Sequence, residues 1–569
     1  MYQIKRLAVA LVLGVWGSQG LAQPKVGPSL AVAANFSQGW RPDILDGTAA
    51  IPVLDFRDTV HWNVVEKEGG RFDFRSWRAA FPGILRARDL DMSLFVNAFH
   101  PAYDGGDTAY TEAAVAAFGT YAARTVARYS NIRSVEVGNE FNGNDFVSGP
   151  VRTPDLEARA GYYVALLKSV YRQVKAVNPD IRIVGGGVHS IPVGYLAMTY
   201  DKGAAAYTDA LALHTYDTPP EHLLRQINVL RRLPEAKTIP IEVTEFGTLD
   251  AAGAPGFLLR NYCQMALSGV DRAVWYPMHP RGDGLVPVVD DAGAPTQTGL
   301  AYKFAQSEFA GLSVEAFNPD PFTYGCLFDR RKLVIWGEPR TLRVSPSLSA
   351  FTATGLAVDQ DELALSATEP LIFLSEHPID PTRDLYFAPQ PLRVDSYHQL
   401  EFPLSGSAPD QTDWQNSILL DGTERPLQTM PGQERQGVPW VPYLGHSDFP
   451  DLRLTAEFLV PTQKDGKDVT VVQSYTASQS GPVAIDAQWK VSGRSEDGIR
   501  LTISLNETPV AERTITDKLH IKNRHILLEK GDNLRFTIGP NGTPWGDYTE
   551  HRIRLSAEIP DQSRLLTAE

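Results

Sequence analysis

Short apolar segments alternate with helical segments from about residue 28 to residue 308, and this alternation limits the possible folds more than any other feature. Each apolar segment is as short as expected for a parallel strand that is buried on both faces. Eight such strands with helices between them predict a closed (β/α)₈ barrel rather than an open sheet. The predicted strands are 30–34, 51–56, 92–98, 134–137, 181–185, 210–214, 239–244 and 273–276.

Two of the segments between these strands are clear helices. Segment 111–129 places Ala and Phe residues on one face and has Glu112 in its first turn, where a negative charge favours a helix. Segment 155–177 is the second, and it ends before Asn178-Pro179.

Two of the predicted strands end on a glutamate. Val-Gly-Asn-Glu-Phe-Asn contains Glu140, and Ile-Glu-Val-Thr-Glu-Phe-Gly contains Glu245. Their separation of about 100 residues equals three βα units of a barrel that is typically about 250 residues long. Barrel enzymes place catalytic groups where strands end at the top face. Two carboxylates that face each other there, one protonated and one ionised, are sufficient to cleave a glycosidic bond.

These motifs resemble those of the clan A glycoside hydrolases, most closely the family 39-like members. Asn139-Glu140 is similar to the Asn-Glu pair that ends strand 4 and supplies the acid/base in that clan. Thr244-Glu245-Phe246-Gly247 is similar to the segment that ends strand 7 and supplies the nucleophile. The resemblance covers roughly residues 50–376. It implies a retaining mechanism, with Asn139 in contact with the sugar hydroxyl next to the anomeric carbon.

The resemblance also implies further substrate-binding residues. Arg57 is expected to hold Glu245 ionised, since a nearby cation lowers a carboxylate pKa. Tyr216 is expected to orient Glu245, and His214 to line the glycone subsite. Trp275 or Tyr276, at the end of the eighth strand, is expected to form a stacking floor under a sugar ring. His100, at the end of the third strand, is a further sugar-contact candidate, with a structural role as the alternative.

The glutamate motif departs from the family pattern at two positions. Gly138 stands where the family often has Trp, and Phe141 where it often has Pro. The missing Trp is expected to leave space behind the acid/base.

After residue 308 the pattern changes to short alternating strands with Gly and Pro turns. We predict a small β-domain over 309–378, packed on the barrel, and a C-terminal β-sandwich over 379–569. Residues 405–440, rich in Gly, Pro, Gln and Asp, predict a long loop or irregular insertion. The sandwich resembles the jelly-roll-like accessory domains of carbohydrate enzymes, so it either binds sugar or buttresses the barrel. The aromatic candidates for sugar binding are Trp440, Tyr443 and Trp545.

The N-terminus predicts a secretory signal peptide over 1–23. Lys5 and Arg6 precede an apolar run from Leu7 to Trp16, which is too short for a membrane span of about 20 residues. The predicted barrel therefore covers 24–308, and we expect the protein to be periplasmic or secreted. Cys263 and Cys326, the two cysteines, can pair in an oxidising compartment or remain as two buried thiols.

These features indicate a retaining glycosidase acting on a β-linked polysaccharide, such as a bacterial exopolysaccharide or a plant glycan. That chemistry needs no cofactor and no metal. The net charge of −14 argues against nucleic acid as a partner. Sequence motifs for nucleotide binding, zinc proteases and α/β-hydrolases are absent. The alternatives are a non-catalytic carbohydrate-binding protein and an assembly component that docks on exopolysaccharide-secretion partners.

Overall fold

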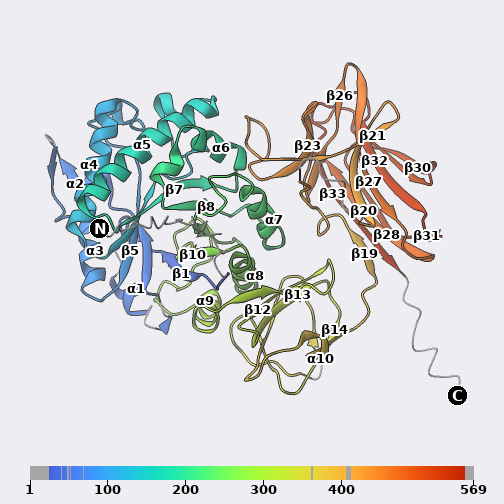
Figure 1. The fold of residues 1–569 in the computed structure, drawn as a ribbon, viewed down its shortest axis with the longest axis horizontal. Coiled ribbons are helices and arrows are strands. Elements are labelled where there is room, and N and C mark those ends of the chain that lie inside the picture. The colour runs from blue at the N-terminus through green and yellow to red at the C-terminus, as the bar shows by residue number, and fades with distance from the viewer. Residues whose placement is uncertain are drawn as a thin grey trace, which may run out of the picture.

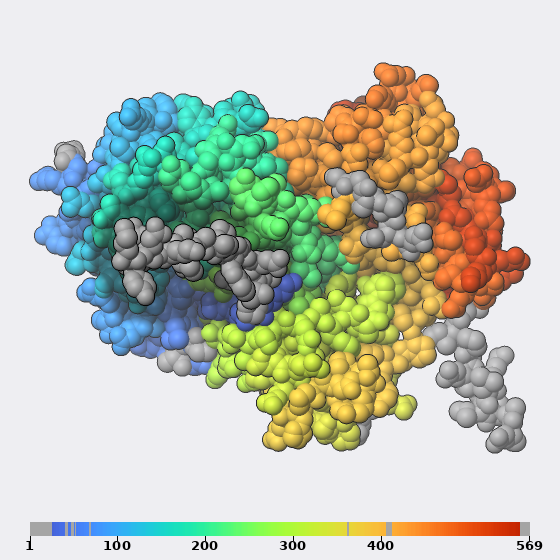
Figure 2. Space-filling model, viewed as in Figure 1, coloured from blue at the N-terminus to red at the C-terminus, as the bar shows by residue number. Residues whose placement is uncertain are grey.

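The computed structural model describes residues 25–39, 42–47, 50–51, 53–67, 70–360, 363–404 and 412–557. The predicted signal peptide lies outside these residues. Three parts follow one another along the chain: a barrel, a smaller β-domain and a C-terminal β-sandwich (Figure 1). Figure 2 shows orange residues of the sandwich in contact with the teal and green residues of the barrel.

The first part forms a closed barrel of eight parallel strands, in the order β1-β10-β9-β8-β7-β6-β5-β2. Each strand coincides with a predicted one to within a few residues, so the predicted fold class is confirmed. Most residues of these strands are buried, as expected for parallel strands covered on both faces. The strands are β1 (Ser29–Ala33), β2 (Asp55–Asp58), β5 (Asp91–Val96), β6 (Ile132–Val137), β7 (Arg182–His189), β8 (Ala210–His214), β9 (Ile241–Phe246) and β10 (Val270–Trp275).

Helices surround the barrel, and the two predicted ones begin at capping side chains. Thr111 accepts a hydrogen bond from the backbone of Ala114, and Asp155 accepts two from the first turn of its helix. None of the helices described is both long and apolar enough to cross a membrane. The helices are α1 (Pro42–Gly47), α2 (Trp62–Val65), α3 (Trp77–Arg86), α4 (Glu112–Arg128), α5 (Leu156–Val177), α6 (Val193–Asp201), α7 (Pro220–Leu230), α8 (Ala254–Leu267) and α9 (Gln297–Glu308); a short hairpin, β3 (Glu66–Lys67) and β4 (Arg71–Phe72), lies between α2 and α3.

The small β-domain is fastened to the barrel. A disulfide joins Cys263 of α8 to Cys326 of the domain, which decides the pairing that the sequence left open. Trp336 Nε1 also donates to Glu221 of α7 at 2.8 Å. The domain has one sheet of β11 (Val314–Ala316), β12 (Thr323–Phe328), β13 (Lys332–Gly337), β17 (Leu371–Leu374) and β15 (Ser349–Phe351), and another of β16 (Leu363–Ala364), β14 (Thr341–Val344) and β18 (Leu385–Phe387), with α10 (Pro381–Asp384) beside them.

The C-terminal part consists of two antiparallel sheets. The first contains β22 (Gln428–Met430), β23 (Tyr443–His446), β24 (Phe449–Leu454), β25 (Phe458–Val460), β33 (Thr549–Ala557), β28 (Gly481–Val491) and β31 (Lys518–Leu528), with β19 (Leu392–Asp395) paired to β33. The second contains β21 (Thr423–Pro426), β20 (Trp414–Leu420), β27 (Lys467–Thr476), β32 (Asn533–Pro540), β29 (Ile499–Leu505) and β30 (Thr508–Ile515), with β26 (Thr462–Lys464) paired to β27.

The prediction of an irregular insertion over 405–440 is wrong for residues 414–430, which form three strands. Residues 405–411 lie outside the described residues. Asp421 and Gly422 both have positive φ, 50° and 72°, and form the tight turn of a hairpin between β20 and β21. The Gly- and Asp-rich composition therefore reflects turn residues between strands. Residues 431–442, named here the sandwich loop, connect β22 to β23 and reach the barrel beside α6 (Figure 1).

Candidate active site

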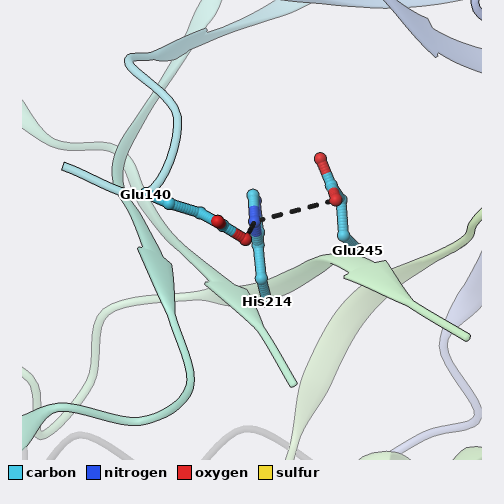
Figure 3. Close-up of side chains that lie close together, drawn as sticks. All are labelled: Glu140, His214 and Glu245. Carbon is cyan, nitrogen blue, oxygen red and sulfur yellow. Dashed lines mark hydrogen bonds and ion pairs between the residues drawn. The ribbon is translucent and has the colours of Figure 1, made fainter. Parts of the chain in front are cut away.

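Glu140 and Glu245 meet at the carboxyl ends of the barrel strands, with His214 between them (Figure 3). Glu140 follows β6, Glu245 lies in β9 and His214 ends β8. One carboxylate oxygen of each glutamate and one ring nitrogen of His214 all lie within 4.8 Å of one another. The fold therefore brings together the two glutamates that the sequence separates by about 100 residues.

The backbone of Glu140 is held in an uncommon conformation. Its φ is 47°, in the left-handed region, which costs a residue other than glycine about 1–3 kcal/mol. Two hydrogen bonds fix this turn: Glu140 N donates to Gly187 O at 2.5 Å, and Gly143 N donates to Glu140 O at 2.8 Å. The turn aims the carboxylate at His214 and across the site towards Glu245.

Two donors bind Glu245, both from the barrel. Arg57 Nη1 donates to Glu245 Oε1 at 2.6 Å, and the Tyr216 hydroxyl donates to Oε2 at 2.9 Å. Burial alone would lower the pKa of Arg57, but the adjacent carboxylates of Glu136 and Glu245 outweigh burial and raise it. Burial and the charge of Glu245 raise the pKa of Tyr216 well above its usual value. Glu245 thus faces a permanent cation and a neutral hydroxyl, and the structure places both of the residues expected beside it in contact with its carboxylate.

Glu140 is bound instead by two imidazoles. His189 Nδ1 and His214 Nδ1 lie 3.2 and 3.0 Å from Glu140 Oε1. Burial raises the pKa of Glu140, but hydrogen bonds from His189 and His214 outweigh it and lower the pKa to about 2. Burial lowers the pKa of both histidines, yet their carboxylate neighbours raise it to about 10 for His189 and about 9 for His214. The resting site therefore keeps its protons on the imidazoles, and the three groups titrate as a coupled set.

Glu136 is a buried carboxylate of β6 that the sequence did not point to. It links Arg57, which binds Glu245, to His214, which binds Glu140. It accepts from Arg57 Nε at 2.6 Å and from Thr244 at 3.0 Å, and it lies 3.2 Å from His214 Nε2. Burial raises the pKa of Glu136, but Arg57 and His214 outweigh it and lower the pKa to about 2. A charged residue within an otherwise apolar predicted strand was the available signal.

His189 was also missed, because β7 runs farther than predicted. The strand was expected to end at residue 185, whereas it continues to His189. Gly186 and Gly187 have positive φ of 93° and 54°, and the pairing of β7 with β8 shifts register there. On its other side the His189 ring contacts Asp217, with Nε2 2.7 Å from Oδ2.

A pocket of about 370 Å³ opens beside the two glutamates. This volume is at the small end of the range for ligand sites, roughly 300–1,000 Å³. Three of the predicted substrate-binding residues line it, namely Asn139, Arg57 and Tyr216. His214 is fully buried and lies behind both carboxylates, so it positions them and does not line a sugar subsite.

Two predicted sugar contacts are corrected by the structure. Trp275 is fully buried; its Nε1 donates to Val286 O at 2.8 Å and its ring packs edge-on against Phe246, so Tyr276 lines the pocket in its place. His100 packs against the rings of Trp62 and Tyr103 and does not line the pocket.

The space that the sequence led us to expect behind Glu140 is also filled. A Cβ on Gly138 would lie 3.0 Å from the ring of Phe141 and 3.4 Å from that of Tyr163. Phe141, which replaces the family's Pro, therefore packs against the position where the family's Trp is missing.

Among the described residues, one group could offer three metal ligands: Glu140, His214 and Glu245. Their surroundings favour protons over a metal ion. Arg57 already places a positive charge 2.6 Å from Glu245, and the raised pKa of His214 keeps a proton on the ring. The donor set therefore fits acid–base chemistry better than metal binding.

Comparisons with known proteins confirm the fold. No family model and no curated protein matches the sequence. A family 39 glycoside hydrolase from the gut symbiont Bacteroides cellulosilyticus WH2 matches with a TM-score of 0.51 at 18% identity, over 62% of this chain and 81% of that chain. A family 39 β-xylosidase from Caulobacter crescentus has a TM-score of 0.45 at 14% identity, over 63% of this chain and 98% of the other. The first of these similarities agrees with the family 39-like fold that the motifs predict.

Proposed function

We propose that this chain is a retaining glycoside hydrolase that cleaves β-glycosidic bonds in a polysaccharide, with Glu140 as acid/base and Glu245 as nucleophile. One observation carries the proposal: carboxylate oxygens of the two residues lie within 4.8 Å of each other. Retaining enzymes hold their two carboxyl groups about 5–5.5 Å apart, whereas inverting enzymes leave about 6.5–9.5 Å for a water molecule. The close pair in this site favours the retaining mechanism.

In the first step a Glu245 oxygen forms a bond to the anomeric carbon, and the glycosidic C–O bond breaks. Arg57 donates to one carboxylate oxygen of Glu245, and the Tyr216 hydroxyl donates to the other. The electrons of the broken bond pass to the leaving oxygen, which takes a proton from Glu140. In the second step Glu140 removes a proton from water, which attacks the same carbon and releases Glu245.

The proton that Glu140 donates comes from its imidazole neighbours. His189 connects Glu140 to Asp217, whose side chain is 62% exposed, so protons can be replaced from solvent along this path. His214 holds a second proton between Glu140 and Glu136. Glu140 is thus ionised at rest and protonated as the leaving oxygen develops charge, which is the cycle an acid/base residue must complete.

We also propose that the protein is periplasmic or secreted and that its substrate is a polysaccharide found there. Asn139 lines the pocket beside Glu140, where it can bind the hydroxyl next to the anomeric carbon. The signal-like N-terminus and the Cys263–Cys326 disulfide support a periplasmic or secreted protein, since disulfides persist in oxidising compartments. A bacterial exopolysaccharide is a substrate class consistent with that location.

The test is release of reducing ends from a panel of β-linked polysaccharides and exopolysaccharides, with Glu245→Gln protein alongside. We expect release by the wild type and none by the variant, with the product keeping its anomeric configuration when followed by NMR. Equal release by both proteins would remove Glu245 from the mechanism. Inversion at the anomeric carbon would contradict the retaining assignment.

A non-catalytic carbohydrate-binding protein is the second candidate. The low pKa of Glu140 favours it, because an ionised residue cannot protonate a leaving group unless the histidines supply the proton. Binding of a polysaccharide by the wild type, without release of reducing ends from that polymer at any pH between 4 and 9, would favour this second candidate.

A further inference from the structure

The sandwich loop is locked to the turn that carries Glu140. Asn142 Nδ2 donates to Gln433 Oε1 at 2.8 Å, and Gln433 Nε2 donates back to Asn142 O at 2.9 Å. Gln433 is 1% exposed although it belongs to a loop. The Asn142 side chain also bonds the backbone of His189 in both directions, at 2.9 and 3.1 Å. Asn142 therefore links the sandwich loop to the backbone of His189 and to the turn that carries Glu140.

The backbones of the sandwich loop and of α6 approach each other closely. Gly194 N donates to Gly432 O at 2.8 Å. A Cβ on Gly194 would lie 2.6 Å from Glu434 N and 2.7 Å from Gly432 O, so only glycine permits this approach. Within the loop, Gln433 N donates to Pro439 O at 2.7 Å, which closes it on itself. Hydrogen bonds within the loop and to α6 therefore hold this loop against the barrel.

Trp440 is the large aromatic side chain that this loop brings to the site. Its ring would lie 3.4 Å from a Cβ on Gly143, the residue that donates to Glu140 O. Its ring centroid lies 5.6 Å from that of His189, at 82°, so the two rings meet edge to face. Trp440 is partly exposed and does not line the 370 Å³ pocket. It lies just outside that pocket, on the Glu140 side.

This position matches the direction in which a leaving group departs. The sugar attacked by Glu245 occupies the pocket, and Glu140 must reach the oxygen that links it to the next residue. The next sugar therefore extends past Glu140, towards His189 and Trp440. An indole ring offers a wide apolar face to which the C–H face of a pyranose can pack.

We propose that Trp440, carried by the C-terminal sandwich, is the platform for the leaving-group sugar, so that the sandwich completes the substrate-binding site of the barrel. This inference rests on the proposed function and assigns the leaving group as a second pyranose ring. It gives the sandwich a role within the site instead of a separate sugar-binding surface.

The experiment compares two leaving groups on one glycone. Xylobiose, cellobiose, mannobiose and gentiobiose are assayed together with the β-glycosyl fluoride of each glycone, since fluoride does not reach Trp440. Trp440→Ala is expected to lower kcat/KM on the cleaved disaccharide by about tenfold or more, equivalent to about 1.4 kcal/mol, and to leave the fluoride rate unchanged. Trp440→Phe, which keeps a ring, should lose less. Trp77→Ala is the matched control, because Trp77 is a tryptophan that is 53% exposed and does not line the pocket.

The outcomes separate this inference from the proposed function. Equal losses on disaccharide and fluoride, or no loss on either, would overturn the platform. Turnover of a fluoride by the wild type without cleavage of any disaccharide would overturn it as well, because no leaving sugar would then be accommodated. If the wild type turned over neither kind of substrate and also released no reducing ends from the polysaccharide panel, the proposed function would fail, and the platform with it.

Discussion

On one side of the pocket Glu245 accepts hydrogen bonds from Arg57 and Tyr216, whereas on the other side Glu140 lies between His189 and His214. Arg57 cannot lose its proton in a protein. The pKa of Tyr216 is raised well above its usual value, so its hydroxyl also keeps its proton. Both histidines can exchange theirs within the range of ordinary buffers. The charge around Glu245 is therefore fixed, and the charge around Glu140 is adjustable.

This difference shows how two glutamates so close together can act differently. A nucleophile must stay ionised throughout, and a permanent cation meets that need. An acid/base must gain and lose a proton in each cycle, and titratable neighbours meet that need. The two glutamates also differ in which parts of the chain hold them. The described donors to Glu245 all come from the barrel, whereas the turn that carries Glu140 is also held by the sandwich loop.

The largest expected effect comes from deleting each carboxylate in turn. Glu245→Ala should lower kcat by at least roughly 10⁴-fold, and Glu140→Ala by roughly 10²–10⁴-fold on a substrate with a poor leaving group. Azide should restore turnover of an activated substrate by Glu140→Ala and give a glycosyl azide of retained configuration. An azide product of opposite configuration from that variant would exchange the two assignments.

A second prediction compares two buried arginines. Arg57→Gln removes the guanidinium that Glu136 and Glu245 share, and Arg272→Gln removes the one that Asp55 and Glu242 share elsewhere in the barrel, where Glu242 keeps an ion pair with Arg182. Each change should lower the free energy of unfolding by about 3–5 kcal/mol, measured by chemical denaturation. Only Arg57→Gln should also lower kcat of the folded protein, by roughly 10²–10³-fold. Equal activity in the two folded variants would deny Arg57 a role at Glu245.

The third prediction concerns pH and applies only to the Glu140 side. The pKa of His189 is raised from 6.5 to about 10 and that of His214 to about 9, so the site retains its protons well above neutral pH. His189→Gln removes the group that holds its proton longest. The alkaline limb of kcat/KM should therefore move to lower pH in the variant. A limb at the same pH in both proteins would show that His189 does not supply the proton.

The smallest expected effect tests the sandwich loop as a support. Gln433→Ala removes both hydrogen bonds to Asn142, which should lower the free energy of unfolding by about 1–3 kcal/mol and reduce kcat several-fold. Gln436→Ala is the matched control in the same loop, since exposed Gln436 donates to Pro154 O, which is not part of the Glu140 turn. Identical kcat in the two variants would show that the loop does not hold this turn.

Local patterns allowed much of the barrel to be predicted. The eight strands follow from short apolar segments, and Glu140 and Glu245 from carboxylates at strand ends. The sequence did not predict which side chain at a strand end faces the pocket, as Trp275 and Tyr276 illustrate. Neighbouring residues of a strand point to opposite faces, so a shift of one position exchanges the buried ring of Trp275 for the partly exposed ring of Tyr276.

The sequence by itself determined the alternation of strands and helices, the two glutamates and the strand-rich C-terminal half, because each depends on residues close together in the chain. Only the tertiary structure decided which groups surround each glutamate. Glu136, His189 and Gln433 reach the site from different strands and from a loop 291 residues away from Asn142. The partner of a buried charge or amide depends on which segments pack together, and that is settled by the docking of strands and domains, which no local pattern encodes.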